Sequence, residues 1–314
     1  MTAVPTVLGT VDSDALGTTY MHEHVFVLTA DAQQNWTDEW DEESRVADAV
    51  EKLTALADQG VQTIVDPTVV GLGRYLPRIR RVNEQVPQLN IVAATGVYTY
   101  EDVPFFFHHR YGDPDPMVDL FVRDLTEGNH GVVAGMLKCA IDAPGLTPGV
   151  ERVMRAVGKA HQRTGAPITV HTHPGTQTAL HVKRVLCDEE GVDPSVVVLG
   201  HSGDSTDVDH LESLAQQGFT LGMDRFGINV QTTFEARADT VVELCRRGLA
   251  DRMVLSQDAA CYIDWLPPEG RSFLPDWHYL HLQDDVLPYL RKEGVTEEQL
   301  TTMLVDVPRR VLAR

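Results

Sequence analysis

The sequence is short of lysine, of cysteine and of positive charge in general. Five of its 314 residues are lysines, four are cysteines, and the formal net charge is −20 at pH 7. A chain this acidic repels phosphate backbones and anionic lipid headgroups, which argues against nucleic-acid and membrane-surface partners. The cysteines lie far apart and form no CxxC pair, which is typical of a reduced chain, so we expect a cytoplasmic protein.

Long apolar stretches and targeting signals are also missing. No uninterrupted apolar run reaches the roughly 18 residues that a membrane-spanning helix needs. Residues 1–10 have neither the basic start nor the apolar run of a secretory signal peptide. No linker rich in proline, glycine or serine divides the chain, so we expect a single domain over residues 1–314.

What the sequence does contain is a regular alternation of apolar, β-branched segments with segments of helical spacing. Strand followed by helix, repeated along a chain, implies parallel strands joined by crossover helices. Eight such units in a chain of this length predict an α/β fold, a closed (β/α)8 TIM barrel, rather than an open doubly wound sheet. The predicted strands are 18–24, 63–66, 91–96, 132–138, 168–171, 196–201, 220–224 and 253–256.

The predicted helices follow the strands. They are 43–59, 76–85, 149–164, 176–190, 207–217, 233–247, 278–292 and 297–312. The segment before the first strand, with Gly9 and Gly17, predicts a short N-terminal β-hairpin at the bottom of the barrel. An open nucleotide-binding sheet would show a glycine-rich phosphate turn after an early strand, and 71–73 is too short and too late for one.

Reactive side chains recur at the C-terminal ends of the predicted strands, where a barrel of this type carries its active site. Alternation along the first strand puts His22 and His24 on one face, so two imidazoles can bind one metal ion. Glu23 points the other way and is expected to have a structural role. Later strand ends supply further groups of the same chemistry, namely Lys138, His171, His201 and Asp258.

Lys138 follows an apolar segment, and desolvation in a barrel mouth lowers the pKa of a lysine. The neutral amine is a nucleophile, which can form a Schiff base with a carbonyl substrate. It can also add CO2 and become a carbamate that bridges two metal ions. Four imidazoles favour the carbamate, because a Schiff-base site has no need of them. A lysine aldolase and a catalytically silent metal-binding protein are the alternatives.

These residues resemble a known family. The set His22-x-His24, Lys138, His171, His201 and Asp258 is similar to the ligand signature of the amidohydrolase superfamily. Further stretches resemble its phosphotriesterase branch, and most of all the phosphotriesterase-like lactonases: 16–24, 63–68, 71–74, 95–98, 200–204 and 223–227. The resemblance covers essentially the whole chain and implies the barrel already predicted.

The resemblance also implies a cofactor and the roles of its ligands. Two divalent ions, zinc in preference to cobalt, iron or manganese, would be bridged by carbamylated Lys138 and a hydroxide. His22, His24 and Asp258 would bind the more buried ion. The more exposed ion would be bound by His171 and His201.

Three residues would have catalytic roles in such a site. Asp258 would accept the proton of the attacking hydroxide and pass it to the leaving alkoxide. Tyr98 would lie at the metal edge, near the substrate oxygen, and Arg225 would help to shape the leaving-group pocket. Gln257 stands where many family members carry histidine, and we expect it to tune the site.

The implied reaction is the opening of lactones, including N-acyl-homoserine lactones (quorum quenching), with promiscuous phosphotriesterase activity on organophosphates of the paraoxon type. A primary aryldialkylphosphatase or esterase is the alternative within the same family. The loop 263–276 would decide the substrate, and four apolar residues could bury an acyl tail: Trp265, Leu266, Phe273 and Trp277. The family further implies a homodimer.

Overall fold

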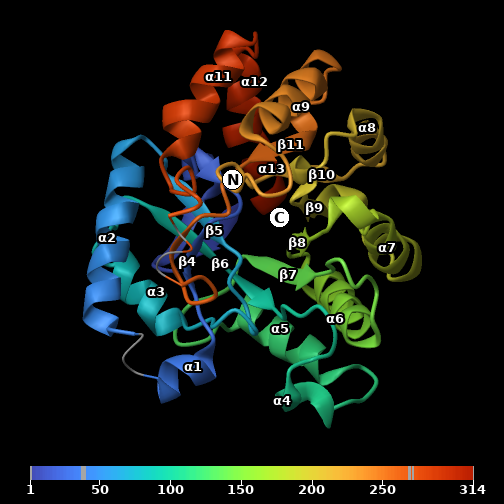
Figure 1. The fold of residues 1–314 in the computed structure, drawn as a ribbon. Coiled ribbons are helices and arrows are strands. Elements are labelled where there is room, and N and C mark those ends of the chain that lie inside the picture. The colour runs from blue at the N-terminus through green and yellow to red at the C-terminus, as the bar shows by residue number, and fades with distance from the viewer. Residues whose placement is uncertain (1, 37–39, 268–269, 271, 314) are drawn as a thin grey trace.

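Eight parallel strands form the centre of the computed structural model, and helices surround them as an outer ring (Figure 1). The structure describes residues 2–36, 40–267, 270 and 272–313. Neighbouring strands in the sheet follow one another along the chain, which confirms the predicted (β/α)8 barrel. The strands are β3 (Thr19–Tyr20), β5 (Thr63–Asp66), β6 (Asn90–Gly96), β7 (Met136–Ala140), β8 (Ile168–His171), β9 (Val197–Gly200), β10 (Thr220–Met223) and β11 (Met253–Leu255).

The N-terminal hairpin is also confirmed. Strands β1 (Ala3–Thr6) and β2 (Gly9–Asp12) pair in antiparallel register. The backbone N–H of Val7, in the turn between them, donates to the carbonyl of Ile91 at 2.8 Å. Because Ile91 lies at the start of β6, the hairpin covers the end of the barrel opposite the strand C-termini.

Two helices show how local sequence sets the boundaries. Helix α2 (Glu42–Asp58) begins after Asp41, whose side chain accepts the N–H of Ser44 at 2.6 Å. Helix α6 (Pro148–Thr164) begins after Thr147 and ends at Gly165, which has a left-handed φ of 72°. The remaining helices over the barrel are α3 (Leu76–Asn83), α5 (Pro116–Thr126), α7 (Ala179–Val182) with the π-helical η4 (Lys183–Glu189), α8 (Val208–Gln216) and α9 (Phe234–Arg246).

The predicted helix 278–292 begins later than expected and starts with a π-helical stretch, and the predicted helix 297–312 is divided by one. The first contains η8 (Leu282–Val286) and α11 (Leu287–Lys292). The second contains α12 (Glu297–Thr301), η9 (Thr302–Asp306) and α13 (Val307–Leu312). The sequence analysis did not predict the short helices α1 (Ala30–Asn35), α4 (Phe105–His108) and α5.

The first barrel strand departs from the prediction. Residues 18–24 do not form one continuous strand, because the chain leaves the sheet after β3 and resumes as β4 (His24–Val27). Strand β4 pairs in parallel with β12 (Ala260–Ile263), which follows the eighth barrel strand and was not predicted. At this break, the buried carboxylate of Glu23 accepts hydrogen bonds from the hydroxyl of Ser256 and from the backbone N–H groups of Gln257 and Ala259. Glu23 therefore joins the first and last barrel units.

The fourth strand begins later than predicted. Val132 belongs to a turn with Asn129, and the N–H of Ala134 donates to the carbonyl of Asp124, so the predicted start lies in the preceding connection. Strand β7 runs instead from Met136 to Ala140. Lys138 consequently lies in the middle of a strand rather than at its end.

The strands separate two apolar clusters. Ile64 and Ile91 pack with the surrounding helices, whereas the adjacent residues Val65 and Val92 belong to a smaller cluster inside the barrel. This is the alternation expected of a strand with both faces buried. Among the described residues, no helix has the length and apolarity needed to cross a bilayer. No disulfide joins the four cysteines, all of which lie among the described residues.

Gly96 makes a testable packing contact at the end of β6. Its φ is 149°, and a Cβ added there would lie 1.8 Å from the carbonyl oxygen of Lys138. Gly96→Ala should therefore force β6 and β7 apart and lower the free energy of unfolding by about 3 kcal/mol, measured by denaturant titration. Gly248→Ala is the control, because Gly248 has a φ of 79° and no atom within 4 Å of an added Cβ. The control should cost about 1 kcal/mol, and equal losses would show that the contact is unimportant.

Candidate metal centre

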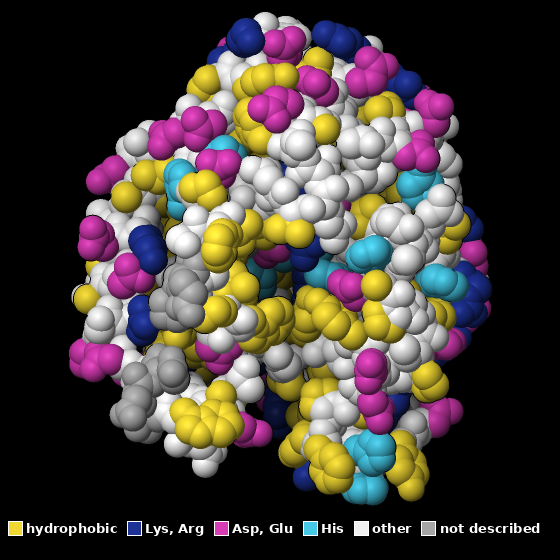
Figure 2. All heavy atoms as spheres, in the orientation of Figure 1, with side chains coloured by type: hydrophobic (Ala, Val, Ile, Leu, Met, Phe, Trp, Pro, Cys, Tyr) yellow, Lys and Arg dark blue, Asp and Glu magenta, His cyan; other side chains and the backbone are white. Residues whose placement is uncertain are grey.

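All of the residues predicted for the site line one cavity of about 270 Å³ at the C-terminal ends of the barrel strands. Figure 2 shows this hollow at the centre of the face, with hydrophobic side chains around it and histidines inside. The common edge of the parallel strands brings together side chains from seven different segments of the chain. The predicted ligands are His22, His24, Lys138, His171, His201 and Asp258, and the predicted catalytic residues Tyr98 and Arg225 lie with them.

The first group of metal donors consists of His22, His24 and Asp258. The Oδ1 atom of Asp258 lies 3.3 Å from Nε2 of His24 and 3.6 Å from Nε2 of His22. Both imidazoles are buried. The distances are those of three donors that surround a common point.

Hydrogen bonds set the tautomers of these two imidazoles. The Nδ1 atom of His22 lies 3.2 Å from the Asp224 carboxylate, which can only accept a proton. The Nδ1 atom of His24 lies 2.7 Å from the Thr68 hydroxyl, which donates its own proton to Asp66. Each ring therefore carries its proton on Nδ1, and each Nε2 presents a lone pair to the Asp258 carboxylate. Three acceptors that face one another are an arrangement in which a cation can bind.

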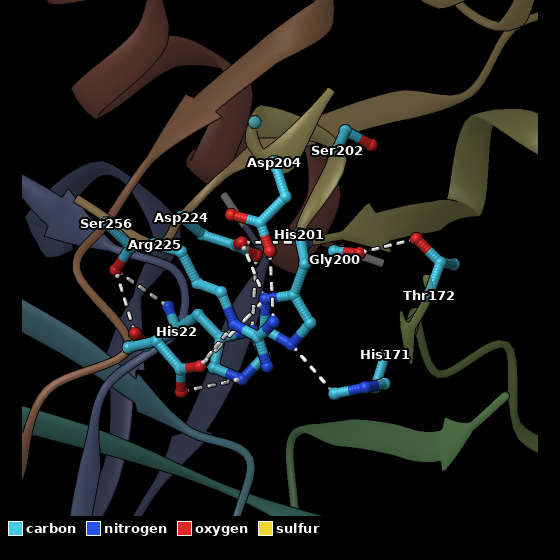
Figure 3. A network of polar contacts seen from close by, with 12 residues as sticks. His22, His171, Thr172, Gly200, His201, Ser202, Asp204, Asp224, Arg225 and Ser256 are labelled. Atoms are coloured by element: carbon cyan, nitrogen blue, oxygen red, sulfur yellow. Dashed lines mark hydrogen bonds and ion pairs between the residues drawn. The ribbon is translucent and has the colours of Figure 1, made fainter. Parts of the chain in front are cut away.

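The second group contains His171 and His201. Nδ1 of His201 lies 3.0 Å from the Asp224 carboxylate, and Nε2 of His171 is hydrogen-bonded to Asp142. The remaining ring nitrogens, Nε2 of His201 and Nδ1 of His171, face each other at 2.9 Å (Figure 3). Burial lowers the pKa of His171 to about 3 and that of His201 well below its usual range. Both rings are therefore neutral, and their two opposed lone pairs fit a second cation.

Lys138 lines the same cavity as these two groups. Its side chain is buried, and burial lowers the pKa of its amine to about 8. Burial is the main cause of the lowered pKa of His22 and of His171. The charge of Lys138 lowers both pKa values further. Lys138 therefore shares one cavity with both groups, as the predicted bridging carbamate requires.

The Arg225 guanidinium contacts a predicted metal ligand, which the sequence did not indicate. Its Nε donates to Oδ2 of Asp258 at 3.0 Å, and its Nη1 donates to Oδ2 of Asp204 at 3.0 Å (Figure 3). The other oxygen of Asp204 accepts from the buried Arg237 at 2.7 Å. Although burial raises the pKa of Asp258, the neighbouring positive charge and hydrogen-bond donors, the Arg225 guanidinium among them, hold it well below its usual range. Asp258 is thus an ionised carboxylate.

Tyr98 lies at the edge of the second donor pair. Its hydroxyl is 3.3 Å from Nδ1 of His171 and is hydrogen-bonded to the hydroxyl of Tyr100. Burial raises the pKa of Tyr98 well above its usual value, so the phenol remains protonated. Tyr98 can therefore donate a hydrogen bond to an oxygen of a ligand in the cavity.

The sequence analysis missed Asp224, which contacts both donor groups. One oxygen accepts from the backbone N–H of His201 at 2.7 Å, and the other lies against His22. The sequence did indicate this residue, because Asp224 ends the predicted seventh strand, 220–224, and reactive side chains at the ends of predicted strands are candidates for the site. Asp142, the partner of His171, lies two residues beyond β7 and was missed because that strand extends past its predicted end.

Comparisons with known proteins show the family to which the chain belongs. The model of the phosphotriesterase family matches residues 2–312. A phosphotriesterase homology protein of Mycobacterium tuberculosis is 54% identical over 323 residues, covering 100% of this chain and 98% of the relative. An aryldialkylphosphatase of Saccharolobus solfataricus is 36% identical over 305 residues, covering 96% of each. A solved structure of the phosphotriesterase from Mycobacterium tuberculosis has a TM-score of 0.97 at 54% identity, covering 99% of this chain and 98% of that one. The chain therefore belongs to the phosphotriesterase family.

Proposed function

We propose that this protein is a hydrolase with two divalent metal ions that opens lactones, N-acyl-homoserine lactones above all, and hydrolyses phosphotriesters more slowly. One observation carries the proposal. A cluster of unprotonated imidazole nitrogens and an ionised carboxylate opens directly into a cavity whose outer wall is apolar. A lactone with an acyl tail has the matching chemistry, because its neutral ester group is attached to a long hydrocarbon chain.

The donor set supports two ions. We assign His22, His24 and Asp258 to one ion and His171 and His201 to the other, with carbamylated Lys138 as the bridge. When bound, the two ions would activate water and polarise the ester oxygen. Imidazole and carboxylate ligands suit zinc, cobalt, iron or manganese.

The protein's own groups would then handle the proton and the substrate oxygen. Asp258 is ionised and lines the cavity, so it can accept the proton of the attacking water and return it to the leaving oxygen. Arg225 lies against that carboxylate and keeps it charged. Tyr98 keeps its hydroxyl proton and can donate it in a hydrogen bond to the ester oxygen.

The outer wall of the cavity supports an apolar tail. Trp265 packs beside Tyr98 with its ring centroid 6.2 Å away, next to the second donor pair. Phe273, which we expected to contact a tail, is 81% exposed and does not line the cavity. The predicted specificity loop includes positions 268–269 and 271, which lie outside the described residues. The apolar lining residues around the mouth are Leu72, Ile228, Ile263, Trp265, Leu266, Leu274 and Trp277.

A substrate panel tests the proposal. Metal-replete enzyme should show a kcat/KM at least about tenfold higher for a homoserine lactone with a tail of about ten carbons than for a tailless γ-lactone, because the tail buries apolar surface. A paraoxon-type triester should be slower than both, and chelation should abolish all three activities. A preference for the triester would favour the second candidate, an aryldialkylphosphatase, which is the activity named for the relative from Saccharolobus solfataricus. Insensitivity to chelators with borohydride trapping at Lys138 would indicate an aldolase.

A further inference from the structure

The segment from Asp276 to Leu282 is attached to the metal-ligand loops by buried hydrogen bonds. The indole Nε1–H of Trp277 donates to the backbone carbonyl of Asp258 at 2.8 Å. The hydroxyl of Tyr279 donates to the backbone carbonyl of His24. One wall of the substrate cavity is thus connected to the backbone of two predicted ligands.

Gln257 holds the same segment from behind. Its Nε2 donates to the carbonyl of Tyr279 at 2.7 Å, and its Oε1 accepts the N–H of Leu282 at 2.7 Å. Gln257 is fully buried. A single side chain therefore pairs two backbone groups at the end of the loop that carries Trp277.

Trp277 has a second cavity behind it, on the side away from the substrate cavity. A second cavity of about 250 Å³, between α2 and residues 274–280, is lined by Ala260, Leu274 and Trp277, and the same three residues line the substrate cavity. The side chains of Trp277 and Leu274 thus separate the two cavities, and we call them the Trp277 partition. A side chain that faces a cavity on one side lacks the close packing that would otherwise hold it. The position of Trp277 therefore depends on its indole hydrogen bond to Asp258 and on the Gln257 hydrogen bonds to Tyr279 and Leu282.

We propose that Gln257 is a positioning residue that fixes the Trp277 partition and thereby sets the preference for substrates with long acyl tails. The inference rests on the proposed lactonase function and extends it to a residue that does not contact the substrate. A cavity wall whose position is already fixed can bind an acyl tail without losing conformational entropy on binding. Without the Gln257 bonds, the partition can move into the second cavity and the tail loses its contact surface.

Gln257→Met is the test, because methionine has a similar volume but pairs with neither Tyr279 nor Leu282. We expect KM for the long-tailed lactone to rise about tenfold, with kcat within about twofold of the wild-type value. Both constants should stay unchanged for the tailless γ-lactone, which does not reach the partition. If Gln257 had only a structural role, its substitution would change the kinetic constants for both lactones alike.

Asn83→Leu is the matched control. The buried Asn83 side chain also pairs two backbone groups, the carbonyls of Val86 and Leu89, at 3.2 and 2.7 Å, but it does not line either cavity. This variant should lose stability without changing the ratio of the two lactone activities. If it changes that ratio as Gln257→Met does, the positioning role is wrong.

Hydrogen–deuterium exchange separates this inference from the proposed function. Without substrate, residues 274–282 should exchange faster in Gln257→Met than in wild type or in Asn83→Leu. Faster exchange in a protein that opens neither lactone would refute the lactonase proposal and leave the Gln257 contact in place. Unchanged exchange, or an unchanged KM for the long-tailed lactone, would overturn the positioning role. Should Gln257→Met fail to fold, Gln257→Glu keeps the acceptor for Leu282 and should give a smaller rise in the same KM.

Discussion

Lys138→Met should lose both metal ions and lower kcat/KM by about 10³-fold or more, which corresponds to about 4 kcal/mol of transition-state stabilisation. Methionine keeps most of the volume of a side chain that is buried in the middle of β7, so the barrel should remain folded. It has no amine that could take up CO2. Neither ion would then have its bridging ligand, and the imidazoles alone leave each site short of donors.

Metal content, activity and 13C NMR in labelled bicarbonate would measure this loss. The control is Lys159→Met on α6, because Lys159 is 42% exposed and its nearest acidic partner, Asp113, is 3.9 Å away. Wild type and the control should show a carbamate carbon signal and two ions per chain. A Lys138→Met protein that retains both ions and its activity would disprove the carbamate bridge.

Asp224→Asn should reduce activity and the affinity for one metal ion by about 100-fold. The backbone N–H of His201 donates to Oδ1 of Asp224, so in the variant the amide oxygen must stay at that position. The amide NH2 then faces Nδ1 of His22, which also carries a proton. His22 is forced into the other tautomer, and its Nε2 can no longer bind the ion shared with His24 and Asp258.

Stepwise metal titration would distinguish this effect from general damage. The ion at His171 and His201 should remain, because His201 keeps its acceptor, so the variant should bind one ion tightly in place of two. Asp209→Asn is the control, since Asp209 is an exposed carboxylate on α8 that pairs with Arg247. Two tight sites in Asp224→Asn would contradict the tautomer argument.

The sequence was sufficient for the barrel and for the gathering of the candidate ligands at one end of it. Strand-helix alternation specifies parallel strands, and parallel strands bring all their C-terminal ends to one edge. His171 and His201 could therefore be placed together without knowing any contact between them. Their side chains do meet at the mouth of the cavity.

Strand boundaries and side-chain partners could not be read from the sequence in the same way. The start of β7 is decided by hydrogen bonds from Val132 and Ala134 to residues of the preceding connection. The pairing of Asp224 with two imidazoles depends on how the ends of β9 and β10 lie relative to the end of β3, which is not their neighbour in the sheet. Hydrophobicity alone also failed to separate Trp277, which lines the cavity, from the exposed Phe273.

The pairing of β4 with β12 has a consequence for the order of events during synthesis. In this ladder His24 is paired with Ala260, which lies two residues after Asp258. The candidate metal group of His22, His24 and Asp258 therefore combines residues that are far apart in the sequence. The chain up to β12 must leave the ribosome before these groups can meet. A nascent chain that stops before the eighth strand contains His171 and His201 but lacks Asp258, so only the finished barrel can hold the ion that we assign to His22, His24 and Asp258.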